Sequence, residues 1–134
     1  MTSAILARTQ SLYFTAVCAL LCSLSFATPT AAPVRAEIDA LLAKLQASGC
    51  QFDRNGTWYT GAEAKDHILR KLEYIEGKGT VQSTEQFIEL AASKSSFSGK
   101  SYQVKCGSDS PVASQLWLTR QLGVIRTSSA RPAL

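Results

Sequence analysis

The residues best suited to chemistry surround the single histidine of this 134-residue chain. Glu63 lies four residues before His67, and Lys71 lies four residues after it. On a helix this spacing places the three side chains on neighbouring turns of one face. A carboxylate beside an imidazole fixes the imidazole tautomer and raises its pKa, as in the orientation of a catalytic base. The pattern therefore indicates a candidate general base, but it contains no nucleophile.

A nucleophile would have to come from the serine-rich stretch 93–98. The resulting hydrolase hypothesis uses His67 with Ser96 and Glu63. The chain has neither a Gly-x-Ser-x-Gly nucleophile elbow nor a serine three residues before a lysine. Two other interpretations of His67 stay open: it binds a ligand, or it orders the serine-rich loop by bonding to a backbone carbonyl or a hydroxyl.

Arg54 is the second candidate, because a planar guanidinium with five donors suits the recognition of a carboxylate or a phosphate. It precedes Asn55-Gly56, the strongest two-residue signal for a β-hairpin turn. Arg54 could instead pair with Asp53, Glu63 or loop carbonyls and have only a structural role. We expect the hairpin, the histidine's helix and the serine-rich loop to meet at one edge of the sheet. The predicted binding cluster is Arg54, Asn55, His67, Lys71, Ser95 and Ser96.

Composition and spacing give little support to metal or cofactor chemistry. One histidine and two distant mature cysteines do not form a zinc set, so we predict no metal and no cofactor. Ser98–Ser101 imitates the end of a phosphate-binding loop, but Lys94 stands where that motif needs its first glycine. The charges are interspersed at a net +4, which argues against a nucleic-acid partner. The partners that stay open are an anionic small molecule, a glycan or an envelope protein.

The first 27 residues have the pattern of a secretory signal peptide. Arg8 supplies a weakly basic start, Leu12–Phe26 is uncharged and apolar, and Ser25-Phe26-Ala27 matches a cleavage site. The apolar run is shorter than the roughly 20 residues of a membrane-spanning helix, so a membrane anchor is the second choice. We predict a periplasmic or secreted protein with no stable membrane span after cleavage. The predicted divisions are a signal peptide (1–27), a mobile leader (28–35), one domain (36–126) and a disordered tail (127–134).

Two cysteines, Cys50 and Cys106, remain after the signal peptide is removed. In an oxidising export compartment such a pair forms a disulfide more often than it stays free. Closing a loop of this length stabilises a small domain by about 4 kcal/mol in the chain-entropy description. The bridge is therefore expected to supply a large part of the net stability.

Hydrophobic spacing and capping signals divide the mature chain into helices and strands. Thr60 and Glu63 match a capping box, and Ser83-Thr84-Glu85-Gln86 matches a second one. Ser110 and Pro111 are expected to begin the last helix. The predicted elements are a helix (36–47), two hairpin strands (50–54 and 57–59), a helix (62–76), a short helix from residue 83, a strand (101–106) and a final helix that ends at residue 123.

The positions of the cysteines also predict the topology. Cys50 begins the first strand and Cys106 ends the third, so a bridge between them suits antiparallel neighbours. The predicted fold class is α+β, with the element order α-β-β-α-α-β-α. A small antiparallel three-stranded sheet in the order 2-1-3 is expected to pack against about four helices on one face.

Several spaced motifs resemble the YfeK-like family of small exported proteobacterial proteins, which is a domain of unknown function. The motifs are Phe52-x-Arg54-Asn55-Gly56, Thr60-x-x-Glu63-Ala64-x-x-His67, Lys71, Phe87-Ile88, Ala92-Ser93-x-Ser95-Ser96 and Gly99-Lys100-x-Tyr102-x-Val104. The resemblance covers residues 38–104 and implies export and a shared domain, but no activity, cofactor or partner. We accordingly predict a non-enzymatic binding or envelope-associated module, with the hydrolase that uses His67 as the alternative.

Overall fold

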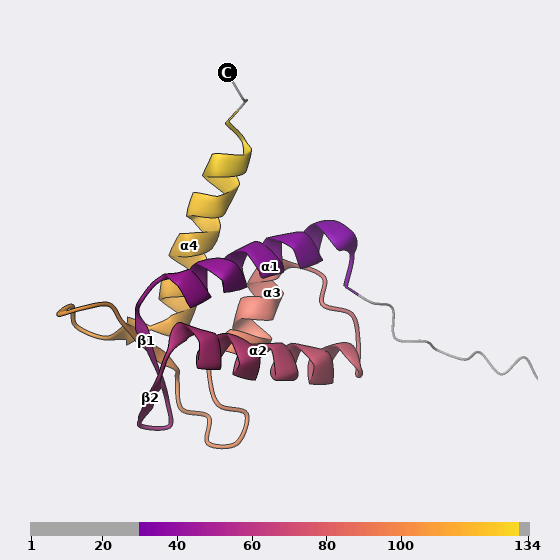
Figure 1. Cartoon of the computed structure of the whole chain (residues 1–134). Helices are drawn as coiled ribbons and strands as arrows, with labels where there is room; N and C mark the ends of the chain where they lie inside the picture. Colours follow the sequence, from indigo (N-terminus) through magenta and orange to yellow (C-terminus); the bar gives the residue numbers. More distant parts are fainter. Residues whose placement is uncertain (1–29, 132–134) are drawn as a thin grey trace, which may run out of the picture.

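The computed structural model describes residues 30–131 and has the α+β architecture that the sequence predicts (Figure 1). Its elements are α1 (Ala32–Ala47), β1 (Gln51–Arg54), β2 (Thr57–Tyr59), α2 (Gly61–Glu76), α3 (Thr84–Phe87), the π-helix η1 (Ile88–Ala92), β3 (Gln103–Lys105), β4 (Val112–Ala113) and α4 (Ser114–Ser129). The predicted signal peptide (1–27) lies outside the described residues. Within residues 30–131, no helix is both long enough and apolar enough to cross a bilayer.

Helix α1 buries the apolar stripe that its sequence predicts. It begins at Ala32, four residues before the predicted start, so residues 32–35 of the predicted mobile leader are helical. Pro33 is compatible with this early start, because an N–H in the first turn has no intrahelical acceptor to lose. Gly49 follows the helix with φ 69°, the left-handed conformation that glycine adopts readily. The buried residues of α1 are Ile38, Leu41, Leu42 and Leu45.

A tight turn and a capping box position β1, β2 and α2. Asn55 and Gly56 have φ values of 56° and 87°, which is the turn geometry that the sequence predicts. Thr60 Oγ1 accepts the N–H of Glu63 at 3.3 Å, and the N–H of Thr60 donates to Glu63 Oε2 at 2.9 Å. Both halves of the predicted capping box are therefore present, and α2 starts directly after Thr60.

The sheet has four antiparallel strands in the order β2-β1-β3-β4, so the prediction of three strands is wrong, although the order 2-1-3 is retained within it. The additional strand is β4, in which Val112 pairs with Val104 of β3. Ser110 and Pro111 were predicted to begin the last helix, but they precede β4, and α4 starts at Ser114. Packing explains the shift, because pairing with β3 places Val112 against the hydrophobic core.

A disulfide joins Cys50 and Cys106, as the sequence predicts, with an S–S distance of 2.00 Å. Cys50 immediately precedes β1, and Cys106 immediately follows β3, its antiparallel neighbour. The bridge therefore fastens one end of the two central strands. Arg54 lies at the other end of β1.

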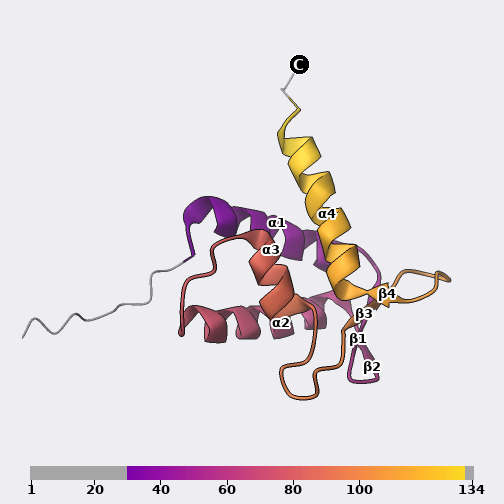
Figure 2. The same cartoon turned by 180° about the vertical axis from the view of Figure 1, so that it is seen from behind.

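One face of the sheet is covered by helices and the other is open. Phe52 and Val104 are only 6% and 1% exposed, whereas Gln51 and Gln103, which alternate with them, are exposed. Phe52 also packs edge-on against Trp117 of α4, with ring centroids 5.6 Å apart. Figures 1 and 2 show α1 and α2 alongside each other with α3 crossing between them, and the sheet lies at the end of α2 where that helix begins.

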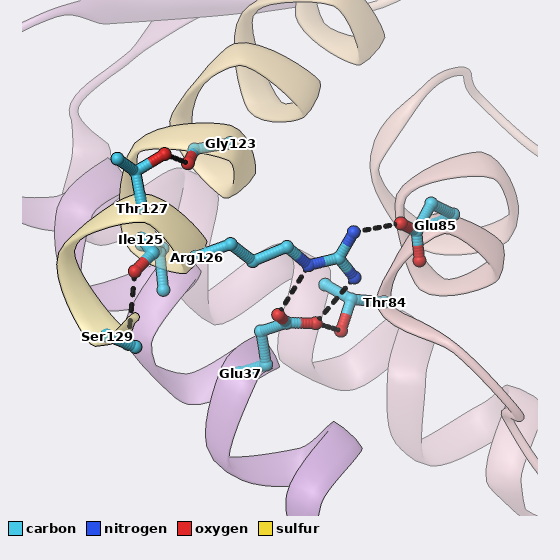
Figure 3. Close-up of polar contacts among 8 residues, drawn as sticks. All are labelled: Glu37, Thr84, Glu85, Gly123, Ile125, Arg126, Thr127 and Ser129. Carbon is cyan, nitrogen blue, oxygen red and sulfur yellow. Dashed lines mark hydrogen bonds and ion pairs between the residues drawn. The ribbon is translucent and has the colours of Figure 1, made fainter. Parts of the chain in front are cut away.

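Helix α4 continues past its predicted end. Gly123 was expected to terminate it, but the helix runs on, and residues 127–129 of the predicted disordered tail are helical. Thr127 Oγ1 donates to the Gly123 carbonyl at 2.8 Å, and the Ser129 hydroxyl makes the same kind of bond two residues further on (Figure 3). Contacts of Arg126 with two other helices hold this part of α4 in place.

Arg126 connects α4 to α1 and α3 (Figure 3). Its Nε donates to Glu37 Oε1 at 2.7 Å, and its Nη2 donates to Glu37 Oε2 at 2.9 Å. Nη1 donates to Glu85, and the Thr84 hydroxyl donates to Glu37. Hydrogen bonds from Arg126 lower the pKa of Glu37 and of Glu85, and the two carboxylates raise the pKa of Arg126. We call Arg126, Glu37, Thr84 and Glu85 the Arg126 cluster.

Candidate functional site

A cavity of about 250 Å³ lies between α2 and the sheet. Phe52 of β1 and Ile68 of α2 contribute apolar side chains to its wall. The polar side chains of the wall that contact one another are Arg54, Tyr59, His67 and Tyr102, and we call them the Arg54 cluster. They come from the hairpin, from α2 and from the chain just before β3, so the fold assembles the cluster from distant segments.

Among the described residues, Arg54 is bonded only to neutral groups. Its Nη1 donates to His67 Nδ1, and its Nη2 donates to the Tyr59 hydroxyl at 3.2 Å. The guanidinium carbon lies 4.7 Å from the centroid of the Tyr59 ring, which is a cation–π distance. Within residues 30–131, no carboxylate oxygen lies within the 4.0 Å of an ion pair with Arg54. The pairing with Asp53 or Glu63 that the sequence leaves open is therefore not made.

His67 is held in its neutral form. Burial, followed by the positive charges of Arg54 and Lys71, lowers its pKa to about 4. The Glu63 carboxylate, which was expected to raise this pKa, is engaged in capping α2 instead. Because Arg54 donates to Nδ1, the proton of the neutral ring is assigned to Nε2. Nε2 lies 3.1 Å from the Tyr102 hydroxyl oxygen and donates to it.

The Arg54 cluster presents hydrogen-bond donors to the cavity. Tyr59 and Tyr102 each accept a bond from a neighbour, which leaves the hydrogen of each hydroxyl to donate. Burial raises the pKa of Tyr102, so this hydroxyl keeps its proton at neutral pH. A guanidinium has five N–H groups, and the contacts of Arg54 with described residues use two of them. An acceptor that enters the cavity therefore meets several donors, one of which is charged.

Three carboxylates also line the cavity but do not neutralise Arg54. Glu63 accepts from the N–H and the hydroxyl of Thr60, and these bonds lower its pKa. Asp66 is exposed. Asp53 Oδ1 is buried, and none of the described residues donates to it. In the described part of the chain, no three His, Cys, Asp or Glu side chains lie together as a set of metal ligands.

Asn55 contacts the serine-rich loop in place of the histidine. Its Nδ2 donates to Ser95 Oγ at 3.3 Å, and its Oδ1 accepts from Ser98 Oγ at 2.5 Å. The hairpin and the loop therefore meet at one edge of the sheet, as expected. The hydrogen bonds that join the hairpin to the loop are made by Asn55, Ser95 and Ser98, and His67 makes none of them.

Lys71 also contacts the loop rather than a ligand site. Its Nζ donates to the Lys94 carbonyl at 2.7 Å and lies 5.3 Å from the centroid of the Tyr102 ring. Burial lowers the pKa of Lys71. Lys71, His67 and Ser96 line a second groove of about 460 Å³ beside the first cavity. The predicted cluster is thus divided between the cavity, the groove and the joint between the hairpin and the loop.

The arrangement for a serine hydrolase is not formed in this structure. Both ring nitrogens of His67 are bonded, one to Arg54 and the other to Tyr102, and no serine of the described chain is bonded to either. Ser93 donates to a helix carbonyl at 2.6 Å, and the Ser95 hydroxyl accepts from two loop N–H groups. The serines therefore order the loop and its junctions.

The sequence reasoning missed Tyr59 and Tyr102 as members of the site. Tyr59 is the cross-strand partner of Phe52, so both side chains lie on one face of the hairpin. Tyr102 stands two residues before the buried Val104, which places both on one face of the third strand and its extension. The period-two pattern of the strands was the signal that could have identified the two tyrosines.

The fold and the cavity define a small disulfide-bridged α+β domain with a donor-rich cavity between one helix and the sheet. Residues 32–126 match the family of unknown function DUF5329, and this match covers most of the chain, which belongs to that family. No curated protein and no solved structure matches the chain. The resemblance to the YfeK-like group and the proteobacterial source that it implies remain predictions.

Proposed function

We propose that the protein is an exported, non-enzymatic binding module for a small molecule that carries an anionic group. The observation that supports this most strongly is Arg54, a half-buried cation whose contacts within the described chain are a neutral imidazole and a tyrosine hydroxyl. A charge removed from water is costly unless an opposite charge or good hydrogen bonds compensate it. A bound carboxylate or phosphate would supply that opposite charge.

The neighbours of Arg54 favour an anion over a neutral ligand. The hydroxyl hydrogens of Tyr59 and Tyr102 are left to donate, and hydrogen bonds to an ionised acceptor are about twice as strong as those between neutral groups. His67 accepts from Arg54 and thereby orients the guanidinium. The ligand would therefore place its anionic group among three donors, two from the hairpin and one from the chain just before β3.

The rest of the wall indicates what accompanies the anionic group. Ala64 and Ile68 of α2 and Phe52 of β1 line the cavity with apolar surface. A volume of about 250 Å³ is slightly below the range of typical ligand pockets, which suits a compact molecule. We therefore propose an anionic group attached to a small apolar or aromatic body, in preference to a glycan chain.

Binding is favoured over catalysis by the state of His67. A general base works best with a pKa near the operating pH, whereas burial and nearby cations hold the pKa of His67 at about 4. Both of its nitrogens are already bonded. These features suit a group that fixes the positions of Arg54 and Tyr102.

Export is proposed from the N-terminal sequence together with the cysteine pair. The first 27 residues have the charge, apolar run and cleavage pattern of a secretory signal. Disulfides persist in oxidising compartments, and Cys50 and Cys106 are joined. We therefore propose that the protein acts in the periplasm or outside the cell.

A thermal-shift comparison tests the proposed function. Benzoate, benzamide and inorganic phosphate are added in turn to purified wild-type protein and to the Arg54→Gln variant. We expect at least one of the anions to raise the Tm of the wild type, by an amount that corresponds to about 2.7 kcal/mol at one hundred times the Kd. Benzamide has nearly the shape of benzoate without its charge, so it should have little effect.

The Arg120→Gln variant is the matched control, because Arg120 is an exposed arginine of α4 that lines neither cavity. It should keep the wild-type response, whereas Arg54→Gln should lose it. His67→Ala should lose part of the response, since Arg54 then lacks the acceptor that orients it. Equal shifts with and without Arg54, or no response to either anion, would contradict the proposal.

A further inference from the structure

The loop between η1 and β3 carries a phenylalanine that has no place in the core. Phe97 is 99% exposed, the highest value among the exposed large hydrophobic side chains of the described residues. We propose that Phe97 and the lysines around it form a contact site for the surface of a bilayer that contains anionic lipids. This site is separate from the Arg54 cavity and does not depend on what that cavity binds.

Hydrogen bonds hold the loop in one shape, although its tip faces solvent. The N–H of Ser95 donates to the Lys100 carbonyl, and the N–H of Gly99 donates to the Ser95 carbonyl, both at 2.9 Å. Ser95 Oγ accepts the N–H groups of Phe97 and Ser98 at 3.3 and 3.2 Å. Gly99 has φ 71°, the left-handed conformation that this turn requires. A loop that is already ordered loses less conformational freedom when its tip binds a surface.

The loop stands where it can reach a surface before the rest of the domain does. The side chain of Asn55 ties it to the hairpin through Ser95 and Ser98. Figures 1 and 2 show the loop and the hairpin turn projecting from the same end of the molecule, opposite the end at which α4 terminates. Insertion of this tip would leave the helices in water.

The charge around the tip suits an anionic surface. The segment Ser93–Tyr102 contains Lys94 and Lys100 and no carboxylate, and both lysines are exposed. Each lysine close to an anionic bilayer strengthens partitioning about fivefold. The neighbouring groove, which Ser96 also lines, adds two exposed apolar residues and two cations: Tyr74, Leu90, Arg70 and Lys71.

A bilayer fits this tip better than a folded protein partner does. A stable protein interface buries about 800 Å² on each side around an apolar centre. Here one aromatic ring protrudes from a tight turn of small polar residues. At the boundary between headgroups and acyl chains, a ring is buried without a shaped pocket, while lysines meet the phosphates. A single such element gives weak, reversible binding.

Fluorescence from the tip tests the proposal directly. The Phe97→Trp variant places a probe at the tip, and Val124→Trp is the matched probe, because Val124 is an exposed apolar residue of α4 at 48%. Each is mixed with vesicles of phosphatidylglycerol and phosphatidylcholine that carry brominated acyl chains, and the wild-type signal is subtracted. We expect a blue shift and quenching for Phe97→Trp alone, both of which weaken as salt is added.

Vesicle sedimentation supplies the second measurement. Phe97→Ser should weaken binding to the same vesicles about tenfold, whereas Val124→Ser should leave it unchanged. All variants have the same N-terminal region, so differences between them report the substituted residue. Equal quenching of the two probes, no quenching of either, or equal quenching in pure phosphatidylcholine would overturn the proposal.

Discussion

Arg54 and Arg126 each bond to two residues through the guanidinium, but the partners of Arg126 are charged and those of Arg54 are neutral. Arg126 is bonded to the carboxylates of Glu37 and Glu85, and Figure 3 shows the guanidinium between them. Arg54 is bonded to the His67 imidazole and the Tyr59 hydroxyl, neither of which carries a charge. The first cation has its counter-ions within the chain. The second has none within ion-pair distance among residues 30–131.

This difference separates a contact that supports the fold from one that is available to a ligand. The Arg126 cluster joins α1, α3 and α4 near the surface, and the carboxylates of the chain itself balance the charge of Arg126. The Arg54 cluster lines a cavity, and its N–H and O–H groups that make no bond to residues 30–131 are available to the ligand that we propose. The side chains of both clusters are hydrogen-bonded. Of the two arginines, only Arg126 also has carboxylate partners among residues 30–131, and our proposal of a ligand at Arg54 rests on this difference.

Removing the disulfide should cause the largest loss of stability, and the loss should be greater around Arg54 than around Arg126. The double substitution Cys50→Ser with Cys106→Ser should lower the free energy of unfolding by about 2–4 kcal/mol. The bridge fastens β1, which carries Arg54, whereas the Arg126 cluster is made by helices. Amide hydrogen exchange should therefore rise more at residues 51–54 than around Arg126. A uniform rise in both regions would show that the two clusters are not independently supported.

Substituting the two arginines should have smaller and unequal effects on the free energy of unfolding. Arg126→Gln should lower the free energy of unfolding by about 1 kcal/mol, because its ion pairs are half-exposed and screened. Arg54→Gln should change it by less than about 0.5 kcal/mol, since no ion pair with a described residue is lost and His67, which is partly exposed, can accept a hydrogen bond from water instead. Urea unfolding at low and high salt measures both, and salt should reduce only the effect of Arg126→Gln. A greater loss for Arg54→Gln would contradict the distinction.

The pH dependence should reveal the cation beside His67. The pKa of His67 is lowered from 6.5 to about 4 in the folded protein, so His67 takes up a proton in the unfolded state first as the pH falls. Stability present above pH 6.5 should thus be lost on the way to pH 4, by about 1 kcal/mol once partial exposure is allowed for. The His67→Gln variant should be flatter between pH 6.5 and 4.5, because it lacks the imidazole that titrates there. Glu37, Glu63 and Glu85, whose pKa values are also lowered, contribute equally to both proteins. Parallel curves for the two proteins would disprove a depressed pKa.

The smallest effect should arise at the joint between the hairpin and the loop. Asn55→Gly keeps a residue that accepts positive φ but removes two hydrogen bonds to the loop. The free energy of unfolding should fall by only about 0.5–1 kcal/mol, because the lost bonds are replaced by bonds to water. Backbone relaxation should show greater motion at residues 95–99 and no change at Arg54. A loosened Arg54 would mean that the loop also supports the cavity.

Local signals in the sequence predicted most of the elements. The turn at Asn55-Gly56, the capping box of Thr60 and Glu63 and the apolar stripe of α1 each depend on residues within one or two turns of each other. The features that were missed depend on contacts outside the element itself. α4 continues where Arg126 reaches two helices that are distant in the sequence. β4 pairs with β3 across a short connection, but it was missed because Ser110 and Pro111 give the local signal of a helix start.

The candidate site was predictable only in part, for a related reason. The residue type of Arg54 indicated anion recognition, and the spacing around His67 indicated a pair with Glu63. The sequence predicts that Glu63 caps its own helix. It cannot show that Arg54 bonds to His67, because that contact depends on how β1 packs against α2. Tyr102 enters the site from a segment 35 residues beyond His67, and only the sheet register brings it there.

The most direct test of anion binding at Arg54 is a titration with benzoate that is monitored by NMR of the arginine side chains. We predict saturable shifts of the Arg54 guanidinium and of the His67 ring nitrogens, with no comparable shift at Arg126, which already has carboxylate partners. Benzamide should leave all three unchanged. Shifts of equal size at Arg54 and Arg126, or none that saturate at Arg54, would contradict the claim that Arg54 binds an anion from solution.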